Sequence, residues 1–539
     1  MDERPDRVQE CGRRRRLWAA PFHPILFCLF PVVSLLAWNV QELYADQAVR
    51  SLLVALTGGL LLWALLAVLT RDVHLGAALT SWAAMLFFSY GHVYDLLGEL
   101  GALGAQLARH RYLLPAWAAL FLAVSGVLIR QRVAIRSAAP VLNAVALTAL
   151  LLPLLSLGTF LVRARTDDGR ATRIPQVVLR PPSGEPAPDI YYIILDGYAR
   201  SDYMAEAFGL DNSEFIDFLE DQGFYVAGAA RSNHNWTSLS LASSLNMTLA
   251  QHLGANMLPG YYPTPFIDFI RNSLVSRSLQ GIGYHTIGIQ SGYLPTEWVE
   301  ADAYLGPATD ALPSLAGGFQ PTAFETMLLD TTLLGPVVSR LSLELEDAPT
   351  RNESYPHEVL RAIILSAFDH LARPLPLEGP RLVFAHIVAP HRPYLFTATG
   401  DPLDPGEPFT LMEEPEAGAD TRELYRDQAA YVTARAQSVI QSILSDSDRP
   451  LVILLQADHG AGLGMGREER TSILNAILIR EPCRPMLYPG ITPVNTFRVV
   501  FNCYFDAQLP LVEDETYWSP WPRESAYEFL RLFPEPTQP

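Results

Sequence analysis

The residues in this chain best suited to chemistry stand at the ends of apolar segments. The run Leu451–Gln456 is followed closely by Asp458 and His459, and the run Ile190–Leu195 is followed directly by Asp196. Apolar runs of this length are typical of buried strands in a parallel sheet, and open α/β sheets bind ligands at the carboxyl ends of such strands. Carboxylate and imidazole side chains there predict a divalent-metal site. The alternative is a set of structural turns without chemistry.

Thr237 is a candidate nucleophile. It stands in the segment NHNWTSLS, just before LASSLNM, at the expected start of a helix. A hydroxyl at a helix N-terminus beside a metal ion can be ionised, because the helix dipole and the cation both favour the alkoxide. The alternative is that Thr237 only caps the helix. The neighbouring Ser238 competes for the role of nucleophile, but successive side chains at a helix start point in different directions.

His386 and His391 lie together in the segment AHIVAPHRPY, at the end of another predicted strand. Two histidines so close to a strand end favour a functional role. The alternative is that one of them is a hydrogen-bonded structural residue.

The elements that must position these residues alternate along the second half of the chain. Apolar and amphipathic patterns predict strands at 190–195, 284–290, 382–388 and 451–456, and helices at 214–223, 264–280, 356–372 and 421–445. This alternation predicts an α/β fold, a doubly wound sheet of parallel strands with helices on both faces. The Pro- and Gly-rich segments 292–350 and 397–420 interrupt it and are expected to be insertions over the strand ends.

The N-terminal half predicts a membrane domain. Five apolar runs, none containing an arginine, are long enough to cross a bilayer: roughly 22–40, 51–69, 75–94, 112–129 and 138–162. Arginines are more frequent in segments that are inside when the N-terminus is cytoplasmic. We therefore expect a multi-pass protein of the cytoplasmic (inner) membrane, with a five-helix transmembrane domain over 1–165, a linker over 166–188 and a catalytic domain over 189–539 on the periplasmic or extracellular side.

Charge and cysteine content narrow the possibilities. Residues 167–539 carry 24 arginines and 48 acidic residues, so this part has a net charge of −24 and is a poor nucleic-acid binder. The chain has four cysteines. Cys483 and Cys503 could pair in an oxidising compartment, and their spacing matches no metal motif.

Four blocks taken in order resemble a known family. DIYYIILDGY, NWTSLSLASSLNM, FAHIVAPHRPY and LLQADHG are similar to the sulfatase branch of the alkaline phosphatase superfamily. With five spans in front, the chain resembles membrane-anchored lipoteichoic acid synthases and lipid-A phosphoethanolamine transferases. The resemblance covers roughly residues 188–515 and implies an alkaline-phosphatase-like α/β/α sandwich.

The resemblance also implies roles for the residues named above. Asp196, Thr237, Asp458 and His459 would hold one divalent metal, Zn²⁺ or Mn²⁺, with Thr237 as nucleophile. His391 would contact the transferring phosphoryl group or its leaving oxygen, and His386 would support it.

Two departures from these relatives matter. The sulfatases mature a Cys or Ser within C/S-x-P-x-R, whereas this chain has Thr237-Ser238-Leu239-Ser240-Leu241, which argues against sulfate-ester hydrolysis. The phosphoethanolamine transferases carry a further histidine after Asp-His-Gly, whereas this chain has Gly466-Arg467-Glu468-Glu469-Arg470-Thr471. Arg470 or Arg467 could neutralise a phosphate there, with a solvated charged turn as the alternative.

The sequence therefore predicts a membrane enzyme that transfers a phosphate-ester group through a phosphothreonine intermediate. Its position at the membrane suggests a phospholipid or envelope-glycan substrate. The alternatives are a phosphodiesterase or other hydrolase with water as acceptor, and a catalytically silent membrane scaffold. A scaffold has no need of this set of metal-type residues. The sequence gives neither the donor, the acceptor nor the oligomeric state.

Overall fold

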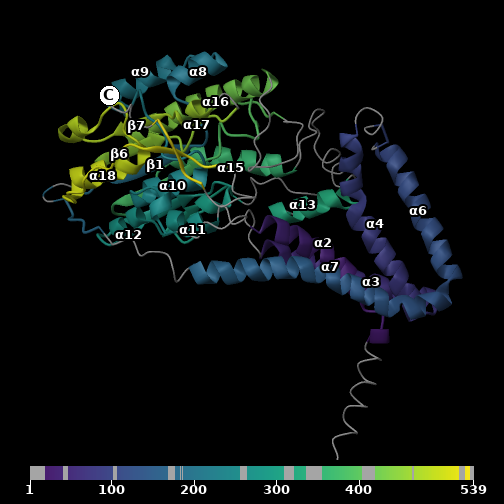
Figure 1. The fold of residues 1–539 in the computed structure, drawn as a ribbon. Helices are drawn as coiled ribbons and strands as arrows, with labels where there is room; N and C mark the ends of the chain where they lie inside the picture. The colour runs from purple at the N-terminus through teal and green to yellow at the C-terminus, as the bar shows by residue number, and fades with distance from the viewer. Residues whose placement is uncertain are drawn as a thin grey trace, which may run out of the picture. The chain divides into compact units, whose positions relative to one another are not determined.

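The computed structural model describes residues 18–40, 46–100, 106–107, 109–167, 177–182, 184, 186–254, 264–308, 321–335, 355–403, 419–463, 466–520 and 528–533. The chain divides into two compact units. Unit 1 comprises residues 1–163 and 314–352, and unit 2 comprises residues 164–313 and 353–539. Figure 1 shows the elements of both units. Parts of the predicted insertions 292–350 and 397–420, and the arginines before residue 18, lie outside the described residues.

Unit 1 is a set of apolar helices. They are α2 (His23–Asn39), α3 (Gln47–Thr70), α4 (Val73–Glu99), α6 (His110–Arg130), α7 (Arg132–Asp167) and α13 (Ala323–Thr331). Among the described residues, four helices are long and apolar enough to cross a membrane, namely α3, α4, α6 and α7, and α2 is shorter at 17 residues. Their positions match the five predicted runs.

α13 packs among the membrane helices although it lies between strands of unit 2 in the sequence. A capping box begins it, because the Thr322 hydroxyl accepts a hydrogen bond from the Glu325 amide while the Glu325 carboxylate accepts one from the Thr322 amide. Phe324 and Leu328 are buried in one cluster with residues of α2 and α3. The predicted insertion 292–350 is thus partly a component of unit 1.

Seven strands form the central sheet of unit 2, in the order β2-β7-β6-β1-β5-β3-β4. They are β1 (Asp189–Leu195), β2 (Tyr225–Val226), β3 (His285–Ile289), β4 (Ala303–Leu305), β5 (Arg381–Ile387), β6 (Leu451–Gln456) and β7 (Asn475–Leu478). β1 lies between β5 and β6 and is parallel to both. β7 is antiparallel to β6, so the sheet is mixed rather than wholly parallel.

Helices cover both faces of this sheet (Figure 1). α16 (Ala419–Asp446) packs with α8 (Ser201–Phe208), α9 (Ser213–Asp221) and α15 (Tyr355–Leu371). α10 (Thr237–Asn246) packs with α11 (Thr264–Arg271), α12 (Leu274–Gln280) and α18 (Pro493–Phe505). Figure 1 shows α8, α9 and α16 on one face and α10, α11 and α12 on the other. The predicted α/β sandwich is confirmed.

Two features of unit 2 differ from the sequence prediction. The single helix expected over 264–280 is two helices, because the Ser273 hydroxyl accepts a hydrogen bond from the Ser276 amide and caps a new start. A separate antiparallel pair of strands, β8 (Thr516–Trp518) and β9 (Leu530–Leu532), was not predicted.

The sheet core holds α10 in place. Every residue of β1 is buried, which agrees with its continuous apolar sequence. The Tyr192 ring lies 5.8 Å from the Phe384 ring of β5 and 5.1 Å from the Phe497 ring of α18. Its hydroxyl shares a 2.7 Å hydrogen bond with Ser244 of α10. α10 is therefore fixed relative to β1 by buried contacts.

Candidate metal centre

The carboxyl ends of three neighbouring strands bring the predicted metal ligands together. Asp196 follows β1, and Asp458 and His459 follow β6. His386 is the second-last residue of β5. Ile194 of β1 is level with His386 on one side and with Gln456 on the other. The side chains that leave these strand ends consequently converge.

Potential ligand atoms form two groups that share Asp196. In one group Asp196 lies with His391 and His459, and in the other with His386 and Asp458, all ligand atoms of a group being within 4.8 Å of one another. All of these residues are buried except His391, which is partly buried. His386 and His391, which the resemblance made catalytic rather than metal-binding, thus lie at ligand distance as well.

The distances centre on one nitrogen. His459 Nε2 lies 3.5 Å from Asp196 Oδ1 and 3.3 Å from Asp458 Oδ2. The Nδ1–H of His459 donates to the Gly460 carbonyl at 2.9 Å, so Nε2 carries the lone pair. Asp196 Oδ1 and Asp458 Oδ2 are buried and have no hydrogen-bond partner among the residues that the structure describes.

Three lone-pair atoms therefore face one another in a buried space. The two carboxylate oxygens have no donor among the described residues, which is costly, and a cation between them would satisfy both. Carboxylate oxygens and a neutral imidazole are ligands of Zn²⁺ and Mn²⁺. The donor set fits a divalent metal.

Burial and neighbouring charges shift the pKa values of the three predicted ligands. Burial lowers the pKa of His459 to about 3, and the charge of Arg470 acts in the same direction, so the imidazole is neutral. Burial and the neighbouring Asp196 charge raise the pKa of Asp458 to about 6. Burial alone would raise the pKa of Asp196, but His391 and His386 hold it below its ordinary value.

Thr237 is the first residue of α10 and its side chain reaches the cluster. Its hydroxyl lies 3.2 Å from His459 Nε2. The residue that caps the helix is Trp236, so capping does not explain the threonine. Ser238, the competing hydroxyl, lies 3.4 Å from the Tyr293 hydroxyl instead. Only Thr237 of the two contacts the predicted ligands.

Arg470, not Arg467, reaches the same point. Its Nη2 lies 3.3 Å from His459 Nε2, its Nε donates to the Asn235 carbonyl at 3.0 Å, and its guanidinium lies over the Trp236 ring. Arg467 lies over the Trp518 ring instead. Gly462, at φ +75°, leaves the space that Arg470 occupies, since a Cβ there would lie 1.9 Å from Nη1.

One residue near the cluster was not predicted from the sequence. Thr296 Oγ1 lies 2.9 Å from His386 Nδ1, while His386 Nε2 lies 3.2 Å from Asp196 Oδ2. The Asp196 carboxylate raises the pKa of His386 against the effect of burial. Thr296 therefore orients the imidazole toward Asp196. The Pro- and Gly-rich composition of its segment indicated a loop over the strand ends, but no pattern identified this residue.

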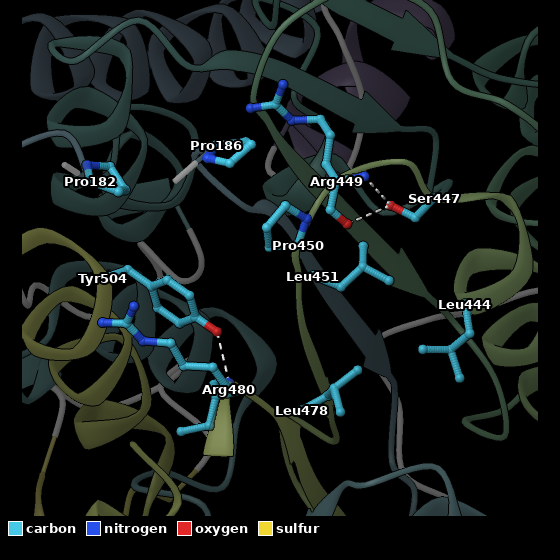
Figure 2. Close-up of a pocket in the computed structure, with 11 residues that line it drawn as sticks. Pro182, Pro186, Leu444, Ser447, Arg449, Pro450, Leu451, Leu478, Arg480 and Tyr504 are labelled. Carbon is cyan, nitrogen blue, oxygen red and sulfur yellow. Dashed lines mark hydrogen bonds between the residues drawn. The ribbon is translucent and has the colours of Figure 1, made fainter. Parts of the chain in front are cut away.

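A cavity of unit 2 lies at the end of β6 opposite to the metal centre. It has a volume of about 390 Å³ and is shown in Figure 2. The side chains of its arginines are engaged in the fold: Arg449 Nη2 donates to the Ala187 carbonyl at 2.6 Å, and Arg480 Nη2 donates to the Cys503 carbonyl. The cavity holds no group of metal ligands found among the described residues.

The two cysteines of unit 2 form a disulfide. Cys483 and Cys503 are bonded with their Cα atoms 5.8 Å apart, which joins the 3₁₀ segment Glu481–Met486 to α18. The pairing that the sequence left open is therefore present.

No family model matches the chain, and no curated protein matches it. The C-terminal periplasmic domain of EptC from Escherichia coli is similar at 12% identity and TM-score 0.41, over 66% of this chain and 96% of that one. A second structure of that domain is a complex with zinc.

Two further structures extend the comparison. The integral membrane lipooligosaccharide phosphoethanolamine transferase A from Neisseria meningitidis is similar at 14% identity and TM-score 0.37, over 90% of this chain and 96% of that one. A putative sulfatase from Bacteroides thetaiotaomicron is similar at 14% identity and TM-score 0.32, over 55% and 65%. Phosphoethanolamine transferases and sulfatases are also the two groups of enzymes that the sequence motifs resemble.

Proposed function

We propose that this protein is a metal-dependent phosphotransferase that acts on a lipid-linked or envelope-glycan phosphate ester through a phosphothreonine at Thr237. The observation that carries the proposal is the position of the Thr237 hydroxyl. It stands at the first residue of α10, 3.2 Å from His459 Nε2, where the unsatisfied oxygens of Asp196 and Asp458 also converge.

The metal would be held by Asp196, Asp458 and His459 together with the Thr237 oxygen, and Zn²⁺ or Mn²⁺ fits these donors. When bound, a divalent metal polarises a phosphate ester and favours the ionised form of a neighbouring hydroxyl. His386 is fixed by Thr296 and supports Asp196 from the opposite side.

The transfer takes place in two displacement steps at the phosphorus. In the first, Thr237 Oγ1 loses its proton and bonds to the phosphorus, the bond from phosphorus to the donor alcohol oxygen breaks, and that oxygen takes up a proton. In the second, the acceptor hydroxyl loses its proton and bonds to the phosphorus, the bond from phosphorus to Thr237 Oγ1 breaks, and that oxygen takes up a proton. A covalent ester lets the enzyme hold the group while one alcohol leaves and another arrives.

Arg470 and His391 suit the charge of the group being transferred. Contacts with Asn235 and Trp236 hold Arg470 beside His459, which in turn contacts Thr237. Its guanidinium is therefore pre-oriented toward the negative charge that develops on the phosphoryl group. His391 donates from Nδ1 to the Arg392 carbonyl at 2.7 Å, which leaves Nε2 as the nitrogen that can bind or carry a proton. We assign it to the phosphoryl group or its leaving oxygen.

The setting supports a substrate on the outer side of a membrane. Four helices of unit 1 are long and apolar enough to cross a bilayer, and unit 2 contains a disulfide, which is typical of compartments outside the cytoplasm. We therefore place the site in the periplasm or on the cell surface.

The test uses the metal-loaded full-length protein and a nitrophenyl phosphodiester. Thr237→Ala should reduce release of nitrophenol to background, and Thr237→Ser should retain part of the rate because it keeps a hydroxyl. Ser238→Ala is the matched control and should stay near the wild-type rate, since Ser238 contacts Tyr293 rather than the cluster. Activity of Thr237→Ala at the wild-type rate would instead indicate direct attack by water.

A further inference from the structure

Unit 1 contains a cavity of about 880 Å³ between its helices. Its lining residues belong to α2, α3, α4, α6 and α13 and to the residues that follow α13. Its walls are almost wholly apolar, and the polar lining residues are few: Arg50, Ser51, Glu325 and Thr332. The volume lies within the range of about 300–1,000 Å³ typical of small-molecule sites.

One face of α3 sets the depth of this cavity. Arg50, Val54, Gly58 and Leu62 all line it and recur every fourth residue, which places them on one side of the helix. From Arg50 to Leu62 the helix rises by about 18 Å at about 1.5 Å per residue. A single leaflet has a hydrocarbon depth of about 15 Å, half of the bilayer core. The stretch of α3 that lines the cavity is therefore about as long as the hydrocarbon of one leaflet is deep.

Glycine leaves this face of α3 open. A Cβ on Gly58 would meet no atom within 4 Å, and a Cβ on the adjacent Gly59 would lie 2.7 Å from Cys28 Sγ. Gly59 thus permits α3 to pack closely on α2. Gly58, by contrast, leaves empty space beside the cavity wall, where a larger side chain would fit without a clash.

The polar end of the cavity is an ion pair between α3 and α13. Arg50 pairs with Glu325, whose carboxylate also belongs to the capping box of α13. The Arg50 side chain is still 51% exposed, whereas that of Glu325 is 7% exposed. Arg50 stands in the first turn of α3, a helix long and apolar enough to cross a membrane. A residue at the end of such a span is expected near the lipid headgroups.

We propose that unit 1 binds one membrane phospholipid, with an acyl chain along the face from Val54 to Leu62 and its phosphate beside Arg50. The shape is that of an amphiphile: an apolar shaft about as long as one leaflet is deep, with an ion pair at its polar end whose exposed partner is the arginine. Lipid tails are as apolar as leucine, so the affinity comes from packing in the cavity and from the charge of the phosphate on the arginine. This inference goes beyond the proposed function and does not depend on it.

The experiment uses the full-length protein in lipid nanodiscs that contain a phospholipid with a photoactivatable diazirine in its acyl chain. After illumination, labelled peptides are identified by mass spectrometry. Labels should concentrate on lining residues such as Val54, Leu62 and Phe121. Gly58→Leu should lower this labelling several-fold, because the leucine occupies the space of the chain. Gly126→Leu is the matched control, since Gly126 lies on α6 in equally open space and does not line the cavity.

The phosphate is tested separately with a diacylglycerol probe that lacks it. The wild-type protein should be labelled several-fold more by the phospholipid probe than by diacylglycerol. The double variant Arg50→Gln, Glu325→Gln removes both charges without leaving a buried carboxylate unpaired, and it should lose this preference.

Two results would overturn the proposal. Labelling spread evenly over exposed membrane-facing residues such as Val68 and Leu152, and unchanged in Gly58→Leu, would show surrounding lipid only. Equal labelling of the wild-type protein by both probes would show that the site does not recognise the phosphate. Because the readout is labelling, either failure leaves the turnover tests at Thr237 unaffected.

Discussion

At the scale of the residue, the metal centre is a place where like charges meet. Asp196 and Asp458 are both buried and their oxygens belong to one group of atoms within 4.8 Å. Burial and this repulsion raise the pKa of Asp458 to about 6. Without a metal, the ionised Asp458 therefore destabilises the folded state.

Asp458→Asn should separate the metal role from the structural role. The amide keeps an oxygen for the hydrogen bond from the Gly197 amide, 3.1 Å in the native protein, but it is a poor metal ligand. Bound metal and turnover should fall to background. At pH 7.5 the metal-free variant should have a higher melting temperature than the metal-free wild type. Its free energy of unfolding should be larger by up to about 3 kcal/mol, because the variant lacks the carboxyl group whose pKa is raised to about 6.

This gain should vanish near pH 4. The folded-state pKa of Asp458 is raised above its unfolded value of about 3.9, so the cost exists above about pH 6 and disappears as both states become protonated. Thermal melts at the two pH values give the result. A variant that melts lower than wild type at pH 7.5 would mean that Asp458 is a structural residue, as the alternative interpretation of the Asp-His-Gly turn holds.

Metal affinity should depend on pH through the same carboxyl group. A ligand must lose its proton to bind a metal, and Asp458 binds a proton below about pH 6 in the metal-free protein. His459 should add no step in this range, because its pKa is lowered to about 3. We expect the apparent affinity for Zn²⁺ to be constant from pH 7 to 8 and to fall up to about tenfold per unit below pH 6. Calorimetric titrations that show no change between pH 7 and pH 5 would contradict this.

Residue types predicted much of the cluster, but local sequence could not rank equivalent neighbours. Arg467 and Arg470 are alike in sequence, and only the five-residue helix α17 (Arg467–Thr471) decides that Arg470 points to His459 while Arg467 meets Trp518. Thr296 was missed because its contact with His386 joins residues 90 positions apart.

At the scale of the element, the turn after β6 is held by a close approach of two backbone segments. Gly460 donates its amide hydrogen to the Arg470 carbonyl at 2.7 Å, and a Cβ at this position would lie 2.1 Å from the Glu469 carbonyl oxygen. The same turn carries His459, and α17 carries Arg470. Glycine here therefore positions two residues of the cluster at once.

Gly460→Ala should accordingly lower metal content and turnover together, because the turn must move by more than an ångström to admit the methyl group. Gly490→Ala is the matched control in unit 2, where a Cβ meets nothing within 4 Å, and it should behave as wild type. Metal analysis and nitrophenyl phosphodiester turnover test both variants. A Gly460→Ala protein with full metal content and rate would show that the turn does not determine the position of His459.

The strands and their polar ends were predictable for a physical reason. A strand buried on both faces needs a continuous apolar run, so β1, β5 and β6 are visible in the sequence, and the first polar residues after them mark the edge of the sheet. The antiparallel direction of β7 was not predictable, because direction depends on how the chain returns to the sheet. The packing of α13 in unit 1 was not predictable for a similar reason. Phe324 and Leu328 indicate an apolar helix face, but the sequence does not tell which helices that face packs against.

At the scale of the whole molecule, two turns of unit 1 carry a cluster of its arginines. The turn between α3 and α4 and the turn between α6 and α7 are joined by a 2.9 Å ion pair between Asp72 and Arg136. Arg71, Arg130 and Arg132 belong to the same two turns. Such clustering is typical of the cytoplasmic side of membrane proteins.

This clustering predicts the topology. A reporter that is active only outside the cytoplasm should be active when fused after Pro539 and inactive when fused after Arg136. The disulfide between Cys483 and Cys503 should then be formed in protein isolated from the membrane with its thiols blocked. The opposite pattern of reporter activity would place unit 2 in the cytoplasm and exclude a substrate on the outer leaflet.

The central claim is that the group being transferred is held covalently on Thr237, and trapping that ester is its most direct test. The metal-loaded full-length protein is exposed briefly to phospholipid donor, quenched in acid and digested, and the peptide containing Thr237 and Ser238 is sequenced by mass spectrometry. We predict that Thr237 carries the added mass of the phosphoryl-bearing group, that Thr237→Ala carries none, and that Ser238→Ala carries it as the wild type does. Added mass on Ser238, or full turnover with no residue modified, would contradict the account.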